Sequence, residues 1–269
     1  MLPALISLCV NAKSRTWDGD DVQFVIPYVA RNAHGLQDTA PLQTILFNAE
    51  EMLVEIVAWT VPDADVEVCD LDTLTKAADS ARLVFTVTTE SGWDCRMDTV
   101  IFDAMLPHLP LNAISMLSAH NDARLSKEVW LSHAPRLTML KRVLLVSSAV
   151  GGFREMLEED ASPNDLPRLP QLTKLILSEV SLTALMTQDL CNMLVKRKEH
   201  GAPLEALDLR TCIGTERAIE LLSETVGTVQ GPATTRLSTP FDEEEERTDD
   251  DEYDDGPGPS FGSMDHNGD

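Results

Sequence analysis

The stretch Leu172-Thr-Lys-Leu175-Ile-Leu177-Ser-Glu-Val180 decides how the rest of the sequence is interpreted. Its apolar residues follow the pattern L-x-x-L-x-L-x-x-(apolar). Leu175 and Leu177 occupy alternate positions, and alternate residues of a β-strand point to the same side. The stretch therefore predicts a short strand with one buried face, which is reached through a turn that Leu172 anchors.

The same pattern recurs at equal intervals. Leu204-Glu-Ala-Leu207-Asp-Leu209-Arg-Thr-Cys212 follows downstream and Leu140-Lys-Arg-Val143-Leu-Leu145 precedes upstream, so that Val143, Leu175 and Leu207 are equally spaced. Four less regular matches extend the series toward the N-terminus: Leu111-Asn-Ala-Ile114-Ser-Met116, Ser80-Ala-Arg-Leu83-Val-Phe85, Leu42-Gln-Thr-Ile45-Leu-Phe47 and Leu5-Ile-Ser-Leu8-Cys-Val10. A strand pattern that returns at a fixed period is typical of a leucine-rich repeat, in which strand–helix units stack on one another. We expect about seven repeats, of which the first three are irregular.

Helical patterns fill the intervals between these strands. They cover residues 20–32, 50–61, 97–108, 126–133, 149–159, 182–198 and 215–226, and Pro27 is expected to kink or end the first of them. Val66–Asp70 alternates like an additional strand and is left open. The sequence thus predicts an α/β leucine-rich-repeat solenoid over residues 1–232, a curved horseshoe with a parallel sheet on its concave face and helices on its convex face.

Charge separates the chain into two regions. The formal net charge is −24 and the pI is near 4.4, which argues against nucleic acid as a partner, because binding to phosphates needs a basic surface. In residues 233–269, 13 acidic residues accompany only Arg236 and Arg247. A segment of this composition cannot bury apolar surface, so residues 233–269 are expected to form a disordered acidic tail.

The cysteines and the longest apolar runs bear on location. Five cysteines are scattered without a C-x-x-C pair, a distribution typical of free thiols in a reducing compartment. No apolar run approaches the ~20 residues that span a bilayer. We expect a cytoplasmic or nuclear protein that does not enter a membrane.

Motifs for catalysis or cofactor binding are missing from the sequence. Gly151-Gly152 lacks the spacing and the following Lys-Ser/Thr of a phosphate-binding loop, and no G-x-S-x-G nucleophile motif occurs. The six histidines lie too far apart for a local metal motif. We therefore expect no enzymatic activity, no cofactor and no metal, and we expect Cys212 to pack at the turn from strand to helix.

The concave face carries the candidate site. In each repeat, the residues just before and after the second leucine of the pattern point away from the buried side. Before it stand Thr44, Arg82, Ala113, Arg142, Lys174 and Ala206; after it stand Leu46, Val84, Ser115, Leu144, Ile176 and Asp208. Three aligned basic residues beside exposed aliphatic ones predict a strip that binds an acidic or mixed segment of a protein partner. The candidate partner-binding residues are Arg82, Arg142, Leu144, Lys174, Ile176, Asp208 and Arg210. Alternatively, the basic residues only keep the sheet face soluble and the aliphatic ones pack on their neighbours.

Two stretches, residues 169–177 and 201–212, resemble fungal, mushroom-type leucine-rich repeat proteins of the F-box group. In that family, the F-box binds a Skp-type adaptor of a cullin–RING ubiquitin ligase and the repeats select the substrate. No recognisable F-box precedes Leu42 here, so the resemblance implies a Skp-type adaptor as partner only if an F-box is missing from this sequence. We expect a non-enzymatic protein-recognition scaffold. The resemblance implies that this scaffold is the substrate-binding part of an F-box-type ubiquitin ligase subunit. The alternative is a stand-alone structural or regulatory leucine-rich repeat protein with no ubiquitin link.

Overall fold

A computed structural model describes residues 8–14, 24–37, 41–50, 53–60, 81–89, 97–121, 123, 125–158, 167–214 and 216–231. All of them lie in the first of the two compact units of the chain, Met1–Arg236. The expected acidic tail at residues 233–269, the open strand at Val66–Asp70 and the anchor Leu5 lie outside the described residues.

Nine strands of the described chain form one sheet in the order β1-β4-β3-β2-β5-β6-β7-β8-β9. Only β3 runs antiparallel to its neighbours; every other adjacent pair is parallel. The strands are β1 (Leu8–Ser14), β2 (Thr44–Glu50), β3 (Leu53–Trp59), β4 (Leu83–Thr89), β5 (Met116–Asn121), β6 (Arg142–Val146), β7 (Lys174–Ser181), β8 (Ala206–Ile213) and β9 (Thr228–Gln230). The expected α/β class is therefore confirmed.

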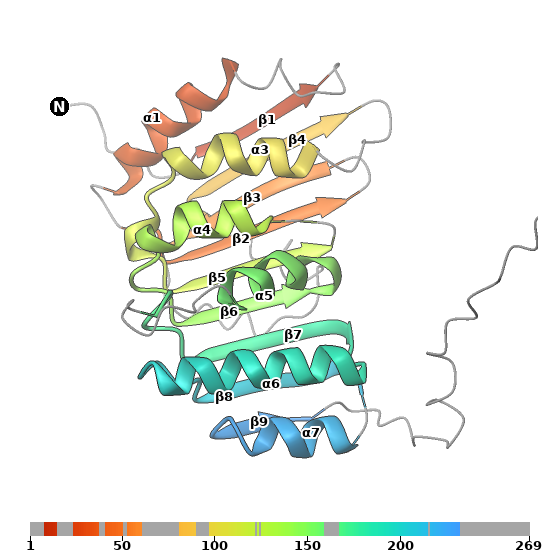
Figure 1. Cartoon of the computed structure of the whole chain (residues 1–269). Helices are drawn as coiled ribbons and strands as arrows, with labels where there is room; N and C mark the ends of the chain where they lie inside the picture. The colour runs from red at the N-terminus through yellow and green to blue at the C-terminus, as the bar shows by residue number, and fades with distance from the viewer. Residues whose placement is uncertain are drawn as a thin grey trace, which may run out of the picture. The chain divides into compact units, whose positions relative to one another are not determined.

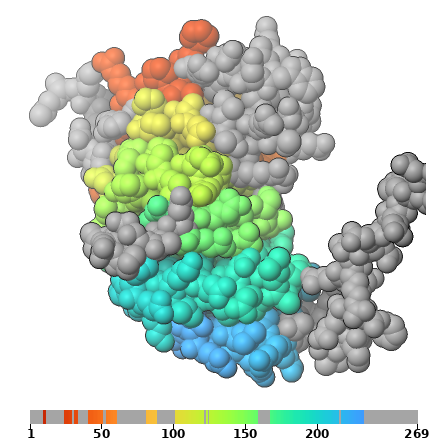
Figure 2. Space-filling view, viewed as in Figure 1, coloured from red at the N-terminus to blue at the C-terminus, as the bar shows by residue number. Residues whose placement is uncertain are grey.

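The described helices cover one face of this sheet and succeed one another in chain order across the surface (Figures 1 and 2). They are α1 (Ile26–Gln37), α3 (Met97–Met105), α4 (Lys127–His133), α5 (Val150–Glu158), α6 (Ala184–Glu199) and α7 (Glu216–Ser223). The main core lies between helices and sheet, where strand residues such as Val143 and Leu175 meet helix residues such as Phe153 and Leu190. Five of the expected helices, those placed at residues 97–108, 126–133, 149–159, 182–198 and 215–226, are confirmed. None of the described helices is both long and apolar enough to cross a membrane.

One backbone contact recurs from strand to strand and explains the regular stacking. The carbonyl oxygen of Ser115, just before β5, accepts hydrogen bonds from the amides of Lys141 and Arg142 at 2.8 and 3.0 Å. The carbonyl of Lys141 binds Thr173 and Lys174 in the same way. The Gln43 carbonyl accepts from the amides of Ser115 and Met116, and the Thr173 carbonyl accepts from those of Glu205 and Ala206. The Glu205 carbonyl accepts from the Thr228 amide. Each strand from β2 to β8 except β3 and β4 is therefore joined to the next parallel strand through the same position.

Two arginines, Arg197 and the half-buried Arg136, add a second recurring contact on the helix side. Arg197 of α6 is 1 % exposed and donates to the carbonyls of Arg168 and Leu169 at 2.8 and 3.1 Å. Arg136, after α4, donates to the carbonyls of Leu106 and Leu109 at 2.8 and 2.5 Å. In both places a guanidinium satisfies carbonyl groups of the turn that leads into the preceding strand, and this fixes the turn to the helix layer.

The N-terminal half departs from the expected order of strands. Residues 50–61 were expected to form a helix, but Leu53–Trp59 is β3, which forms a hairpin with β2 through register pair Glu50–Leu53. The prediction was wrong because Val54, Ile56 and Ala58 face the helix-side core while Val57 and Trp59 are buried on the opposite face. Burial on both faces removes the alternation that marks a strand in sequence.

Insertion of this hairpin also changes the neighbours of β4. The order of the repeats predicts that the strand at Leu83 lies between those at Ile45 and Ile114. Instead, β4 pairs with β1 and β3, and β2 pairs directly with β5. The expected sequential order is therefore wrong for the first strands and holds from β5 to β8, and the edge strand β9 was not predicted.

The strand expected around Ile114 is displaced by three residues. β5 starts at Met116, and Leu117, not Ile114, pairs with Val143. Ile114 takes the place of the anchoring leucine, because Leu111 belongs to a separate short 3₁₀ turn. The first helix is displaced as well: α1 starts at Ile26, so Pro27 stands in its first turn, where the missing amide costs no hydrogen bond, and does not end or kink it.

The helix-free sheet face as candidate functional site

The face of the sheet opposite the described helices, which we call the helix-free face, presents its side chains in rows that cross the strands. Alternate residues of each strand point to it, and the pairing register aligns them. The row nearest the amino ends of the parallel strands contains Trp59, Thr44, Met116, Arg142, Lys174, Ala206 and Thr228. Arg142 and Lys174 therefore lie side by side on β6 and β7, as predicted, and both are half-buried.

Arg82 does not join these two residues. It precedes β4, and strands β3, β2 and β5 lie between β4 and β6. Its amide donates to the Ala58 carbonyl at 2.9 Å, which places it at the same end of the sheet but in the N-terminal half. The prediction of three aligned basic residues is wrong for Arg82, because it assumed that the repeats stack in chain order.

The next row is mainly apolar and contains Val84, Val57, Leu46, Ser118, Leu144, Ile176, Asp208 and Gln230. Leu144 and Ile176 are adjacent but only 1 % and 6 % exposed, and with Val146 they form a small cluster separate from the main core. They were predicted to be exposed, and this is wrong. Ala113 and Ser115, predicted for this face, are replaced by Met116 and Ser118 because of the three-residue displacement of β5.

Asp208 and Arg210 form an ion pair along β8. The Arg210 guanidinium makes bonds of 3.0 Å through Nε to Oδ1 and of 2.8 Å through Nη2 to Oδ2 of Asp208. The aspartate side chain is 4 % exposed, whereas that of Arg210 is 52 % exposed. The predicted site residues thus include one buried acid whose charge is matched by an exposed arginine that reaches over it.

A polar row toward the carboxyl ends of the parallel strands was missed from the sequence. It contains Thr86, Glu55, Asn48 and His120, which pair in that order across β4, β3, β2 and β5. His120 is 4 % exposed, and its Nε2 lies 2.6 Å from the hydroxyl of Ser118. Burial lowers the pKa of His120 to about 4, so its imidazole is neutral at neutral pH.

Glu55 lies half-buried in the middle of this row. Desolvation raises the pKa of the Glu55 carboxyl, and the neighbouring charge of Glu50 acts in the same direction. A hydrogen bond of 3.5 Å from the Thr86 hydroxyl opposes the shift. In the sequence, the alternation of Ser118 with His120 is the signal of this row. It indicates a polar row only when the position of β3 and the register of β5 are known.

Buried polar side chains concentrate on the helix-free face. Of the nine buried polar or charged side chains among the described residues, six lie there: Thr44, Asn48, Ser118, His120, Ser178 and Asp208. A buried polar group is costly unless it is hydrogen-bonded, so such groups mark places where more than apolar packing is selected.

The Ser118–His120 pair has the residue types of a nucleophile and its base, but its environment does not suit that chemistry. A pKa of about 4 makes the imidazole a weak base at neutral pH, and the serine is only 2 % exposed. Among the described residues, no group of three or more His, Cys, Asp or Glu side chains could hold a metal ion. The arrangement is suited to holding polar groups in fixed positions on a sheet face.

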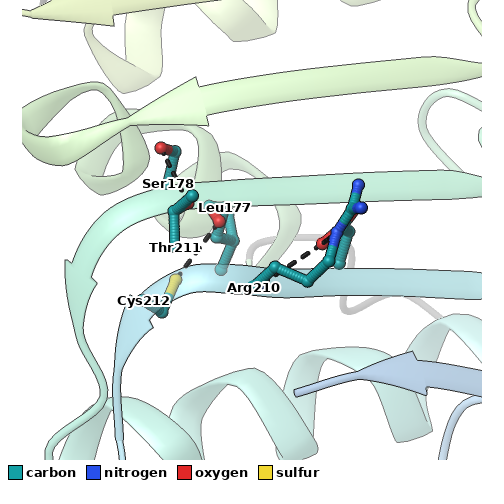
Figure 3. A network of polar contacts seen from close by, with 6 residues as sticks. Leu177, Ser178, Arg210, Thr211 and Cys212 are labelled. Carbon is teal, nitrogen blue, oxygen red and sulfur yellow. Dashed lines mark hydrogen bonds and ion pairs between the residues drawn. The ribbon is translucent and has the colours of Figure 1, made fainter. Parts of the chain in front are cut away.

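The carboxyl ends of β7 and β8 carry a further polar network (Figure 3). The Thr211 hydroxyl donates to that of Ser178 at 2.8 Å, and the Cys212 thiol donates to the Leu177 carbonyl at 3.2 Å. Cys212 is 3 % exposed, in accordance with the predicted packing role at the end of the strand. Here β7 bends, because the register with β8 shifts and Glu179 adopts a positive φ of 58°.

Comparison with known proteins adds no further assignment: no protein-family model, no curated protein and no solved structure matches the chain.

Proposed function

We propose that the protein is a non-enzymatic recognition scaffold, a leucine-rich-repeat solenoid that binds an acidic or mixed segment of a protein partner at the amino-end row of its helix-free face. The observation that carries this proposal is the adjacency of Arg142 and Lys174 on β6 and β7. Their half-buried side chains stand on an otherwise acidic chain, and opposite charge on a partner would be drawn to this point.

The regular half of the sheet supports the repeat part of the proposal. The strand cores of β6, β7 and β8 recur at equal intervals along the chain, centred on Val143, Leu175 and Leu207, and the same carbonyl position joins each strand to the next. Side chains at equivalent positions of such units form a continuous row, which is how repeat proteins build extended binding surfaces. The guanidinium of Arg210, two strands from Arg142, is exposed, but its charge is matched by Asp208, so the positive charge of the proposed surface comes from Arg142 and Lys174.

The test is fluorescence anisotropy with a labelled peptide of alternating glutamate and leucine as the probe. The double variant Arg142→Glu, Lys174→Glu of the full chain should bind at least about tenfold more weakly, since two attractions become repulsions. Binding to the unmodified protein should also weaken with added salt, because exposed charge pairs are screened.

The matched control reverses two exposed basic residues on the helix side, Lys196→Glu and Lys198→Glu. This control has the same net charge as the test variant and should bind the peptide like the unmodified protein. Equal loss in both variants would mean that the peptide senses only net charge, and no loss in either would refute the proposed surface.

The resemblance to F-box proteins leads to a narrower proposal, that the repeats select substrates for a cullin–RING ubiquitin ligase. A purified Skp-type adaptor mixed with the full chain distinguishes this from a stand-alone regulatory protein. A complex on size exclusion would support the ligase link. Separate elution would favour the alternative, a structural or regulatory leucine-rich repeat protein.

A further inference from the structure

The sheet ends in two edge strands, β1 and β9, that run in the same direction. Among the described residues, β1 pairs with β4 alone and β9 with β8 alone. β3 is antiparallel to both β2 and β4, so β4 runs in the same direction as β2. β1 is parallel to β4 and therefore runs in the same direction as every strand from β5 to β9. A strand edge with unused amide and carbonyl groups is a template for a further strand.

The β9 edge continues the contact that joins the other strands. The Thr228 amide donates to the Glu205 carbonyl, so Thr228 is directed toward β8 and the amide of Val229 is directed away from it. Gly227 holds the position that Ser115, Lys141 and Thr173 hold before their strands, and its carbonyl is the next acceptor of the series. The sequence Thr228-Val-Gln230 contains neither a charge nor a proline to discourage pairing.

β1 has the alternation that a strand beside β9 would need. Val229 packs against the main core, while Thr228 and Gln230 are exposed. In β1, Val10 packs against the same core and Asn11 is exposed. A β1 strand placed parallel to β9 would set Val10 beside Val229 and extend both the core and the helix-free face.

We propose that the β9 edge of one copy of this chain receives the β1 edge of a second copy, so that two sheets join head to tail as one parallel sheet. The contact uses different surfaces on the two copies and does not close, so it leads to chains of copies rather than to a dimer. Each copy carries a net charge of −24, so the association is weak at low ionic strength and strengthens as salt screens the repulsion.

Sedimentation equilibrium of the full chain tests the proposal at low and high sodium chloride. The average mass should rise above the 29.6 kDa of one chain with concentration, and more so at high salt. Val229→Pro removes the outward amide and should keep the protein at the mass of one chain, whereas Val229→Thr keeps the amide and should associate like the unmodified protein. Gln230→Lys, which places a charge on the edge, serves as the second variant if Val229→Pro lowers the circular dichroism of the fold.

A mixing experiment distinguishes this contact from other self-association. Asn11→Lys puts a charge on the β1 edge and should also be monomeric. An equimolar mixture of Asn11→Lys and Val229→Pro should form a two-chain complex and nothing larger, because each variant retains one intact edge. An unmodified protein that stays monomeric, a Val229→Pro variant that still associates, or a mixture without the complex would each overturn the proposal.

Discussion

Replacing Arg197 by methionine tests whether a buried guanidinium holds the turn before β7. The substitution retains most of the aliphatic volume and removes the donors to the carbonyls of Arg168 and Leu169. A buried carbonyl left without a donor costs about 1–3 kcal/mol. The Leu169 carbonyl keeps the Leu172 amide as a second donor at 3.0 Å and so loses less than this, and the bond to the Arg168 carbonyl is only partly buried.

Backbone strain in the turn limits the expected loss. Leu169 has a positive φ of 50°, a conformation that costs a residue with a side chain roughly 1–2 kcal/mol and persists only where its surroundings hold it. Without Arg197, part of this turn can relax, and the strain released offsets part of the lost hydrogen bonding. We therefore expect Arg197→Met to lower the free energy of unfolding by about 1–3 kcal/mol, a substantial share of the roughly 5–15 kcal/mol of an ordinary domain.

Urea unfolding followed by far-UV circular dichroism measures this loss. Lys198→Met, on the exposed side of the same helix, is the matched control and should change the unfolding free energy by less than about 0.5 kcal/mol. Buried charges can be replaced by apolar residues at no cost when the new packing is good. A loss below about 1 kcal/mol for Arg197→Met would show that this is the case here and would refute the holding role.

Two glycines and a histidine give further predictions. Gly151→Ala should stabilise α5 by up to about 1 kcal/mol, because nothing lies within 4 Å of the added Cβ. Gly152→Ala should destabilise α5 by more than about 2 kcal/mol, because the added Cβ would overlap the Leu125 carbonyl. Urea unfolding of the two variants checks that the two changes in stability have opposite signs. The folded His120 has a pKa of about 4, below its ordinary 6.5, so the unfolded chain binds a proton first and stability falls as the pH drops from 6.5 toward 4. Between pH 7 and pH 5 the unmodified protein should therefore lose about 2 kcal/mol of unfolding free energy that the His120→Gln variant does not lose. Replacement of the exposed His108 by glutamine serves as the control and should leave this loss in place. Equal pH profiles for His120→Gln and the unmodified protein would contradict the buried, neutral imidazole.

The regular half of the fold could be predicted from sequence because each unit is decided locally. From Val143 onward, one strand and one helix alternate at a fixed period, and the core residues of each unit contact the neighbouring unit. Leucine at the same positions is then enough to give the register, which is why Arg142 and Lys174 were correctly placed side by side.

The N-terminal half could not be predicted because the decisive contacts are distant in sequence. β2 pairs with β5 although β3, β4 and α3 all lie between them along the chain, and β3 enters between β2 and β4 through a hairpin that the periodic pattern does not show. β3 is buried on both faces, so its apolar run was compatible with a helix as well as a strand. The error in Arg82 follows from this one strand, and the omission of the Glu55–Asn48–His120 row follows from it together with the three-residue displacement of β5.

The buried polar groups are distributed unevenly between the two faces of the sheet. On the helix side, each of the three has a packing explanation: Arg197 binds turn carbonyls, Thr187 donates to the Thr183 carbonyl of its own helix, and the ring of His133 lies 3.5 Å from the Arg136 guanidinium that holds the turn before β5. The helix-free face holds the other six, of which Ser118 and His120 contact each other, Ser178 contacts Thr211, and Asp208 contacts Arg210.

An apolar pair in place of Ser118 and His120 would serve the sheet about as well, because replacing both partners of a buried polar contact by apolar groups can be nearly neutral. The polar character of these positions is therefore not explained by stability. This asymmetry between the two faces is a physical reason to look for function on the helix-free face, and it does not depend on the resemblance to leucine-rich repeat proteins.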